Sequence, residues 1–311
     1  MIKRIYIKKI LVSSVALFAF FLIYFIPNDK KMDLTIKQEV KYVNSDITTH
    51  NIYLLDKDNY VAKTEIVIND NEIENVAKYL LTALIIDGEY EDKIPNGFRA
   101  LIPSDTNILD IEYKDNLVKV NFSDSLLDTE MEEQVIEAII YTLTSINGVD
   151  KVIILIDGKI LTKLPKSNIN LPSTLDRSFG INKEYDVNKN KNISKTTIYY
   201  VNKYNDLEYY VPVTKINNDE RDKIEIIIDE LSSKNIYRTN LMSYLNSNTK
   251  VLSVNEDNNS MMIDFNDYIF NDIESKDILE EVIYTICLSI YDNYKVNEVV
   301  FRVNNEEIYK N

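Results

Sequence analysis

The second half of the chain repeats the first, and this duplication limits the possible fold more than any other feature of the sequence. Phe265 follows Phe122 by 143 residues, inside matching stretches of alternating apolar and polar residues. Tyr284-Thr285 follows Tyr141-Thr142 by the same 143 residues. Similarity at a fixed spacing is typical of a structural unit that is written twice. We therefore expect one register to hold through two strands, a loop and a helix of each copy.

Each copy contains a strand pattern followed by a helix pattern. The first copy alternates apolar and polar residues up to Tyr113 and again from Val118 to Phe122, which predicts two half-buried strands. Lys114-Asp115-Asn116 between them predicts a hairpin turn. A helical apolar stripe follows, with Gly148 as its expected C-cap. Its members are Val135, Ile136, Ile139, Ile140, Leu143 and Ile146, and the second copy repeats it with Ile278, Leu279, Val282, Ile283, Ile286 and Ile290.

An earlier helix is predicted in each copy, at about Ile73 to Ile86 and at about Arg221 to Leu231. Each module thus has the expected order strand, helix, strand hairpin, helix, strand. Two helices on one face of a small sheet is the economical way to bury these apolar faces. The predicted fold class is α+β: two tandem two-layer modules, each a small mixed sheet with two helices on one face, behind an N-terminal transmembrane helix.

The N-terminal segment is expected to anchor the chain in a membrane. Residues 10–26 carry no charge, follow four basic residues and end at Pro27. That length is at the lower limit for a spanning helix, and the preceding positive charge orients the N-terminus towards the cytoplasm. A cleaved secretory signal is the alternative, but small residues of the usual cleavage pattern do not follow the run. We expect a single-pass protein of the cell membrane, with its C-terminal modules outside the cytoplasm.

These patterns divide the chain into five parts. Residues 1–27 form the cytoplasmic tip and transmembrane anchor, and residues 28–50 form a stalk. The two modules occupy residues 51–163 and 196–311. Between them, residues 164–195 are rich in Asn, Lys, Ser and Asp without sustained periodicity, which indicates a linker.

The composition excludes several classes of function. A net charge of −15 opposes binding to nucleic acid, whose phosphates need basic partners. Cys287 and His50 are the only residues of their types, so no disulfide or thiolate metal cluster can form within one chain. Only 5 glycines are present, and none forms a phosphate-binding loop. We predict no cofactor and no metal.

No residue pattern predicts a catalytic site. His50 is expected in a solvated loop, and Cys287 is expected to be a small buried side chain. The repeated Tyr141-Thr142 pair has no recurring base, so packing or a helix-to-sheet hydrogen bond is the expected role. Asp56–Asn59 and Glu256–Asn259 lack the ligand spacing of a calcium loop and are interpreted as turns.

Several of these segments together resemble the GerM domain family, the sporulation and spore-germination module of endospore-forming bacteria. The resemblance is strongest at Leu101–Leu109, at Ile140–Val152 and at Asp157-Gly158-Lys159, and it covers most of residues 51–311. In the second copy, Asn246 replaces Pro103 and Asn305 replaces Gly158. The resemblance implies a fold of the ring-building type that acts through protein contacts. Tandem relatives are lipoproteins, whereas this chain has no cysteine after its apolar run.

The resulting hypothesis is a non-catalytic assembly or interaction protein of the sporulation envelope. The resemblance implies that its partners are other envelope proteins or the channel proteins between mother cell and forespore, and a homo-oligomer is left open. Two alternatives remain at this point. One is an extracytoplasmic small-ligand (germinant) binding protein, and the other is an enzyme that acts on cell-wall glycan, for which fifty acidic residues offer many carboxylate pairs.

Overall fold

The computed structural model describes residues 48–233, 240–257 and 259–310. Residues 46–311 form one compact unit, separate from residues 1–45. The predicted anchor at residues 10–26 lies outside the described residues, as does nearly all of the predicted stalk. Within the described part, no helix is both long enough and apolar enough to cross a membrane.

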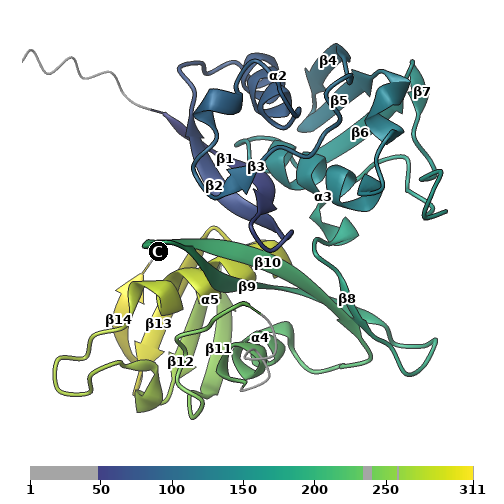
Figure 1. Ribbon diagram of the computed structural model, residues 1–311. Coiled ribbons are helices and arrows are strands. Elements are labelled where there is room, and N and C mark those ends of the chain that lie inside the picture. Colours follow the sequence, from purple (N-terminus) through teal and green to yellow (C-terminus); the bar gives the residue numbers. More distant parts are fainter. Residues whose placement is uncertain (1–47, 234–239, 258, 311) are drawn as a thin grey trace, which may run out of the picture. The chain divides into compact units, whose positions relative to one another are not determined.

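Module 1 contains seven strands and two α-helices among the described residues (Figure 1). The alternation of Val118, Val120 and Phe122 produces the predicted strand, because all three side chains are fully buried. Asp115 and Asn116 adopt positive φ angles of 52° and 60°, as a two-residue hairpin turn requires. The elements are β1 (Thr49–Asp56), β2 (Val61–Val67), α2 (Ile73–Ala83), β3 (Phe98–Arg99), β4 (Ile108–Lys114), β5 (Leu117–Phe122), α3 (Glu132–Leu143), β6 (Lys151–Ile156) and β7 (Lys159–Ile160).

Module 2 follows the short strand β8 (Glu184–Asp186) and repeats this order, except that its described residues contain no counterpart of β3. Its helix α4 begins at an Asp222 cap, whose carboxylate accepts a hydrogen bond from the Ile224 backbone N–H. The elements are β9 (Ser194–Tyr204), β10 (Leu207–Asn217), α4 (Lys223–Ser232), β11 (Val251–Asp257), β12 (Ser260–Phe265), α5 (Glu280–Asn293), β13 (Glu298–Val303) and β14 (Glu306–Lys310).

The strands form three sheets. Each module has its own four-stranded mixed sheet, in the orders β4-β5-β6-β7 and β11-β12-β13-β14. The third sheet follows the order β3-β1-β2-β10-β8, with β9 paired to β10, so it contains the first hairpin of both modules. The two modules are therefore joined through backbone pairing between β2 and β10.

The small mixed sheets with helices on one face are present as predicted, but the two-layer description is incomplete. In module 1, α3 also packs against β1, where Thr142 Oγ1 accepts a hydrogen bond from the Tyr53 backbone N–H at 3.0 Å. In module 2, Ser289 Oγ of α5 accepts the corresponding bond from Tyr199 at 2.9 Å. Each helical layer thus lies between a small sheet and the shared sheet (Figure 1). The first hairpin of each module belongs to a different sheet from the last four strands of that module, which the strand pattern alone did not reveal.

The predicted 143-residue register is wrong for the last helix. Tyr141 is fully buried, whereas Tyr284 is 39% exposed. The hydrogen bonds to the first strand instead match Thr142 with Ser289, which is an offset of 147 residues. Four extra residues therefore precede α5. An α-helix turns once every 3.6 residues, so a four-residue slip leaves an apolar stripe nearly in place and hides the insertion.

The C-cap prediction at Gly148 is also wrong. Helix α3 ends at Leu143, and tight turns separate it from Gly148. Gly148 has a positive φ angle of 90° and contacts β4. Its carbonyl oxygen accepts a hydrogen bond from the Tyr113 hydroxyl at 3.2 Å.

The segment between the modules is packed against both of them. Leu164, Leu175 and Ile181 are buried in the core of module 1. Strand β8 pairs in parallel with β10, and Leu175 pairs with Val152. The low periodicity of residues 164–195 led us to interpret them as a linker, and in the structure the isolated apolar residues of this segment pack into the core of module 1.

Candidate functional site

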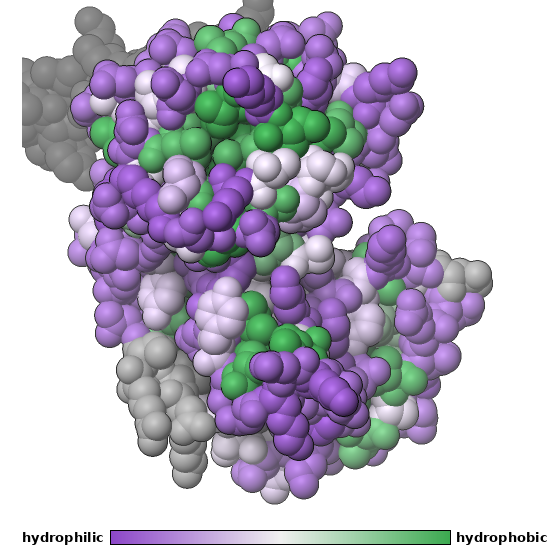
Figure 2. Space-filling model, turned by 90° about the vertical axis from the view of Figure 1, so that its right-hand side faces the viewer, coloured by the Kyte–Doolittle hydropathy of each residue, from purple (hydrophilic) through white to green (hydrophobic). Residues whose placement is uncertain are grey.

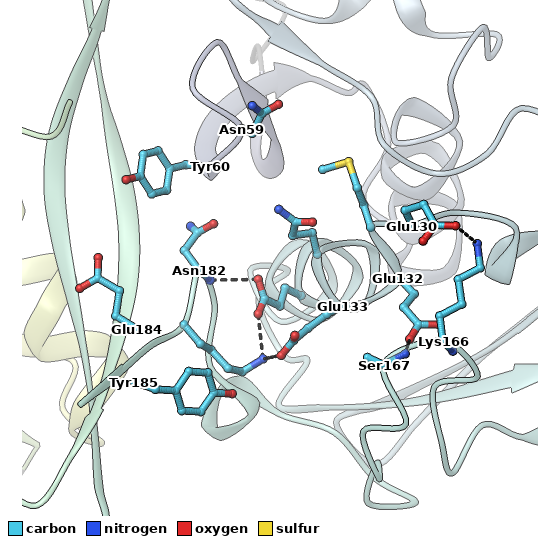
Figure 3. A pocket seen from close by; sticks show the side chains of 14 residues that line it. Asn59, Tyr60, Glu130, Glu132, Glu133, Lys166, Ser167, Asn182, Glu184 and Tyr185 are labelled. Atoms are coloured by element: carbon cyan, nitrogen blue, oxygen red, sulfur yellow. Dashed lines mark hydrogen bonds and ion pairs between the residues drawn. The ribbon is translucent and has the colours of Figure 1, made fainter. Parts of the chain in front are cut away.

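A pocket lies where the N-terminus of α3 meets the irregular segment and the β1–β2 turn (Figure 3). Its volume is about 690 Å³. The lining contains five glutamates and two lysines and no histidine or cysteine. These charged residues are Glu130, Glu132, Glu133, Glu137, Glu184, Lys166 and Lys183.

Glu132 opens helix α3 and holds the irregular segment to it. Its carboxylate accepts hydrogen bonds from the backbone N–H groups of Lys166, at 3.1 Å, and Ser167. Burial by itself raises the pKa of Glu132, but the hydrogen bonds from Ser167 and Lys166 outweigh it and hold the pKa below its usual range. Acidic residues in the first turn also suit the positive end of the helix dipole. Glu132 is therefore a structural carboxylate that stays ionised.

Glu137 and Lys183 form a buried ion pair at the back of the pocket. The Lys183 Nζ lies 2.7 Å from Glu137 Oε1 and 2.8 Å from Glu133 Oε1. The other oxygen, Glu137 Oε2, accepts a hydrogen bond from the Asn182 backbone N–H at 2.9 Å. Burial raises the pKa of Glu137 even though Lys183 opposes the shift. Both carboxylate oxygens are occupied, so the geometry suits holding the segment better than transferring a proton to a substrate.

Asn182 connects this pocket to the contact between the modules. Its Nδ2 donates to the carbonyl oxygens of Val61 in β2, at 2.8 Å, and of Pro212 in β10, at 2.7 Å. Its Oδ1 accepts a hydrogen bond from the Val61 backbone N–H at 2.9 Å. One side chain of the intervening segment thus satisfies backbone groups of both modules where β2 and β10 separate.

Arg177 forms a second connection between the modules, which we call the arginine latch. Its guanidinium pairs with Asp292 of α5, and its Nε donates to Thr144 Oγ1 of module 1 at 3.0 Å. The guanidinium carbon also lies 4.9 Å from the ring centroid of Tyr141. Burial tends to lower the pKa of Arg177, but the neighbouring Asp292 carboxylate raises it well above its usual value.

Equivalent tyrosines meet beside the arginine latch. The hydroxyl oxygens of Tyr53 and Tyr199 lie 3.0 Å apart, and the Tyr199 hydroxyl donates to Asp292 Oδ2 at 2.9 Å. Both tyrosines occupy the same position in the first strand of their module, and the second strands β2 and β10 pair antiparallel with Lys63 opposite Tyr210. The modules therefore contact each other through corresponding surfaces, as in a two-fold symmetric dimer.

The turn at Asp56–Asn59 has a structural role that sequence reasoning missed. It is a turn, as predicted, but Asp56 is completely buried. Its carboxylate accepts hydrogen bonds from Asn202 Nδ2 at 2.9 Å and from the Tyr209 hydroxyl at 3.0 Å, both in module 2. The signal in the sequence was an aspartate directly after the apolar run at residues 52–55 of β1, which indicates a buried acceptor when polar side chains of another strand lie beside it.

The remaining single residues are placed as follows. Cys287 is buried in α5, as predicted. The prediction of a solvated loop at His50 is wrong, because His50 lies in β1 opposite Ile66, where burial lowers its pKa. Among the described residues, no three His, Cys, Asp or Glu side chains are grouped so that they could hold a metal ion.

Comparison with known proteins identifies the class to which this two-module fold belongs. The profile of the Germane family, described as sporulation and spore germination, matches residues 51–162 and again residues 197–309. The chain therefore belongs to the Germane family, with two copies of its domain.

Two relatives match both copies. The chain is 33% identical over 261 residues to the spore germination protein GerM of Bacillus subtilis, covering 81% of this chain and 70% of the relative. The solved structure of the tandem GerMN domains of the sporulation protein GerM from Bacillus subtilis superposes with a TM-score of 0.74 at 30% identity. That match covers 84% of this chain and 92% of the solved one. The tandem arrangement is thus shared with an experimentally determined relative.

Proposed function

We propose that this protein is a non-catalytic assembly or interaction protein of the sporulation envelope. Residues 10–26 anchor it in the membrane, and the two modules act outside the cytoplasm through contacts with the channel complex between mother cell and forespore. Membership of a sporulation and germination family and similarity to the Bacillus subtilis relative support the process. Support for an interaction role comes from the structure of the two modules.

One observation carries the interaction role: the side chains that recur between modules are those that hold the fold. Asn121 and Asp264 occupy the same strand position in the two modules. Each accepts a hydrogen bond from a backbone N–H in the last turn of its module, that of Gly158 at 2.9 Å and that of Asn305 at 3.1 Å. The pocket is not repeated in this way. With the offset of 147 residues found for α5, the position of Glu137 is occupied by Tyr284. Duplication has kept the scaffold and not a reactive group.

The surface supports the same proposal. Figure 2 shows an apolar area on the upper half of the molecule, where the small sheet of module 1 lies, within a mostly hydrophilic surface. Exposed apolar side chains on this sheet include Leu109, at 52% exposure, and Ile160, at 47%. Exposed apolar areas bordered by polar residues are typical of protein contact sites.

The test is deletion of the gene followed by counting heat-resistant spores. The proposal predicts a large fall in spore number and mislocalised channel proteins, with recovery when the wild-type gene is restored. Normal numbers of fully resistant spores from the deletion strain would contradict it.

The pocket supports a second candidate, an extracytoplasmic small-ligand (germinant) binding protein. A volume of about 690 Å³ is within the range of small-molecule sites. A ligand that binds only the native state raises the melting temperature. A thermal-shift screen of the 46–311 unit against amino acids, sugars and nucleosides therefore tests this candidate, and Glu137→Gln should abolish any shift that arises in the pocket.

The glycan-cleaving alternative has a direct assay. The purified 46–311 unit is incubated with peptidoglycan, and released fragments are measured by chromatography. The interaction proposal predicts no release above that of heat-inactivated protein. Release that disappears in a pocket glutamate variant would establish an enzyme instead.

A further inference from the structure

The outer edge of the small sheet differs between the two modules. Strands β4 and β11 are the corresponding edge strands, since each is the first in its four-stranded sheet. Both contain a β-bulge at the same position, with an exposed leucine: Leu109 is 52% exposed and Leu252 is 61% exposed. The bulge is common to both modules, so the difference between the two edges lies in the residues that follow it.

The hairpin register shows which backbone groups of β11 face outward. Asp257 pairs with Ser260, with two residues between them, and such a closing pair is hydrogen-bonded. Hydrogen-bonded and non-hydrogen-bonded pairs alternate along an antiparallel ladder. The backbone N–H groups of Glu256 and Val254 therefore point away from β12. In module 1, Lys114 and Leu117 form the closing pair, so the backbone N–H of Tyr113 points away from β5. This N–H group donates a hydrogen bond to Glu74 Oε1 of α2 at 3.3 Å.

The edge of module 1 is protected in three ways. Glu74 accepts the outward N–H of Tyr113, as just described. The side chains of Ile111 and Tyr113 pack against the hydrophobic core of module 1. Strand β4 also ends in Lys114, a residue type that discourages pairing with another strand.

The edge of module 2 lacks these protections. Val254 is 40% exposed, and Glu256, which occupies the position of Tyr113, is exposed as well. Within the described residues, no hydrogen bond from the backbone N–H of Val254 or Glu256 is formed. The last position of the strand is Asp257 in place of Lys114. Beyond its bulge the β11–β12 register is regular, and an edge whose outward donors and acceptors have no partner among the described residues is a template for one more strand.

The charge of this edge selects the kind of strand that it accepts. The β11–β12 hairpin carries no lysine or arginine, and its exposed acidic residues are Glu256 and Asp257, whereas Asp264 is buried. The matching hairpin of module 1 has the acidic residues Asp110, Glu112 and Asp115, but Lys114 and Lys119 offset most of their charge. We propose that the outer edge of β11 binds an extended segment of a partner protein in which apolar and basic residues alternate. The partner's backbone pairs with Val254 and Glu256. Its apolar side chains lie on the face of the sheet that carries Val254, and its basic side chains lie on the opposite face, which carries Asp257.

This inference rests on the proposed interaction role, and it adds the surface and the chemistry of the partner. Electrostatic complementarity predicts that binding weakens as salt is added, because exposed charges are screened. Backbone pairing with the partner strand also predicts that, when the partner is bound, hydrogen exchange slows at the outward amides of β11 and stays unchanged at those of β4.

The test measures binding of a labelled ten-residue peptide of alternating lysine and valine to the 46–311 unit by fluorescence anisotropy. Val254→Pro removes an outward N–H without removing a ladder bond to β12, so the sheet should remain intact. We expect this variant to bind at least 10-fold more weakly. Val254→Ala, which keeps the N–H, should lose less than about 3-fold. Circular dichroism and thermal melting check that each variant is folded.

Three controls keep the result specific. The equivalent change in module 1, Ile111→Pro, should leave peptide affinity within 2-fold of wild type. A peptide of alternating glutamate and valine should bind at least 10-fold more weakly than the lysine peptide. Glu256→Lys combined with Asp257→Lys should reverse that preference.

Two outcomes would overturn the proposal. One is undiminished peptide binding by a folded Val254→Pro variant. The other is a wild-type unit that dimerises in sedimentation analysis and becomes monomeric on Val254→Pro, which would make a second copy the occupant. Either result leaves the sporulation role intact, because that role is judged separately from the spores of the deletion strain.

Discussion

Replacing Arg177 by methionine should destabilise the tandem unit by about 3 kcal/mol. The change removes the guanidinium and keeps an apolar chain of similar length. Its partner Asp292 has a side chain that is only 3% exposed, and leaving one member of a buried ion pair alone costs about 3 to 5 kcal/mol. The lower figure applies because the Arg177 side chain is itself 26% exposed and because Tyr199 still donates to Asp292. Loss of the contact with the Tyr141 ring adds less than about 1 kcal/mol.

A double-mutant cycle measures this interaction in isolation. Urea unfolding of the 46–311 unit gives the free energy of unfolding for wild type, Arg177→Met, Asp292→Asn and the double variant. We expect destabilisation by about 3 kcal/mol for Arg177→Met, about 2 kcal/mol for Asp292→Asn and about 3 kcal/mol for the double variant. The two single effects then exceed the double effect by about 2 kcal/mol, which is the coupling between the two residues. A control at an exposed pair, Lys166→Met with Glu130→Gln, should show a coupling below about 0.5 kcal/mol. Additive effects at Arg177 and Asp292 would refute the latch.

Three further changes probe other parts of the tandem unit. Gly97 has a φ angle of +95°, and a Cβ there would lie 2.5 Å from Tyr204 Cγ. Gly97→Ala should therefore lower the free energy of unfolding, measured with urea, by about 3 kcal/mol. The control Gly158→Ala, whose Cβ would meet no atom within 4 Å, should lower it by about 1 kcal/mol. Glu137→Gln should lower the melting temperature by several degrees, because it weakens the hold on buried Lys183, whose side chain is 6% exposed. Burial raises the pKa of Tyr199 well above its usual value of 10.0, so its contribution is fully present below pH 10 and is lost as the pH rises towards the folded-state pKa. Urea titrations from pH 8 to 11 should show stability falling above pH 10, with a smaller slope in Tyr199→Phe, and equal slopes would contradict this assignment.

The sequence predicted the local elements better than their assembly. Hairpins and amphipathic helices depend on periods of two and 3.6 residues, so Val118, Val120 and Phe122 identified β5 and its turn without further information. The pairing of β2 with β10 joins strands about 150 residues apart, and the alternation along each strand does not name its neighbour. The same limit concealed the sandwich of helices between two sheets.

The candidate site was less predictable than the fold. Arg177 and Asn182 lie in a segment without periodicity, where a charged or amide side chain ordinarily indicates solvent exposure. Their partners Asp292, Val61 and Pro212 are brought to them only by tertiary folding. The error at Tyr284 has a similar origin. A repeated Tyr-Thr pair suggested an ungapped helix, and only the bonds from Thr142 and Ser289 to the first strands revealed the insertion.

We propose that this chain acts in spore formation through protein contacts and not through catalysis. The most direct measurement is the number of heat-resistant spores formed by a deletion strain that carries, in turn, wild-type and variant genes. We expect a large loss of spores on deletion and recovery with the wild-type gene, with Glu130→Gln and with Glu184→Gln. We expect no recovery with a folded Val254→Pro variant. Normal spore numbers in the deletion strain, or failure of both pocket variants beside full recovery by Val254→Pro, would contradict it.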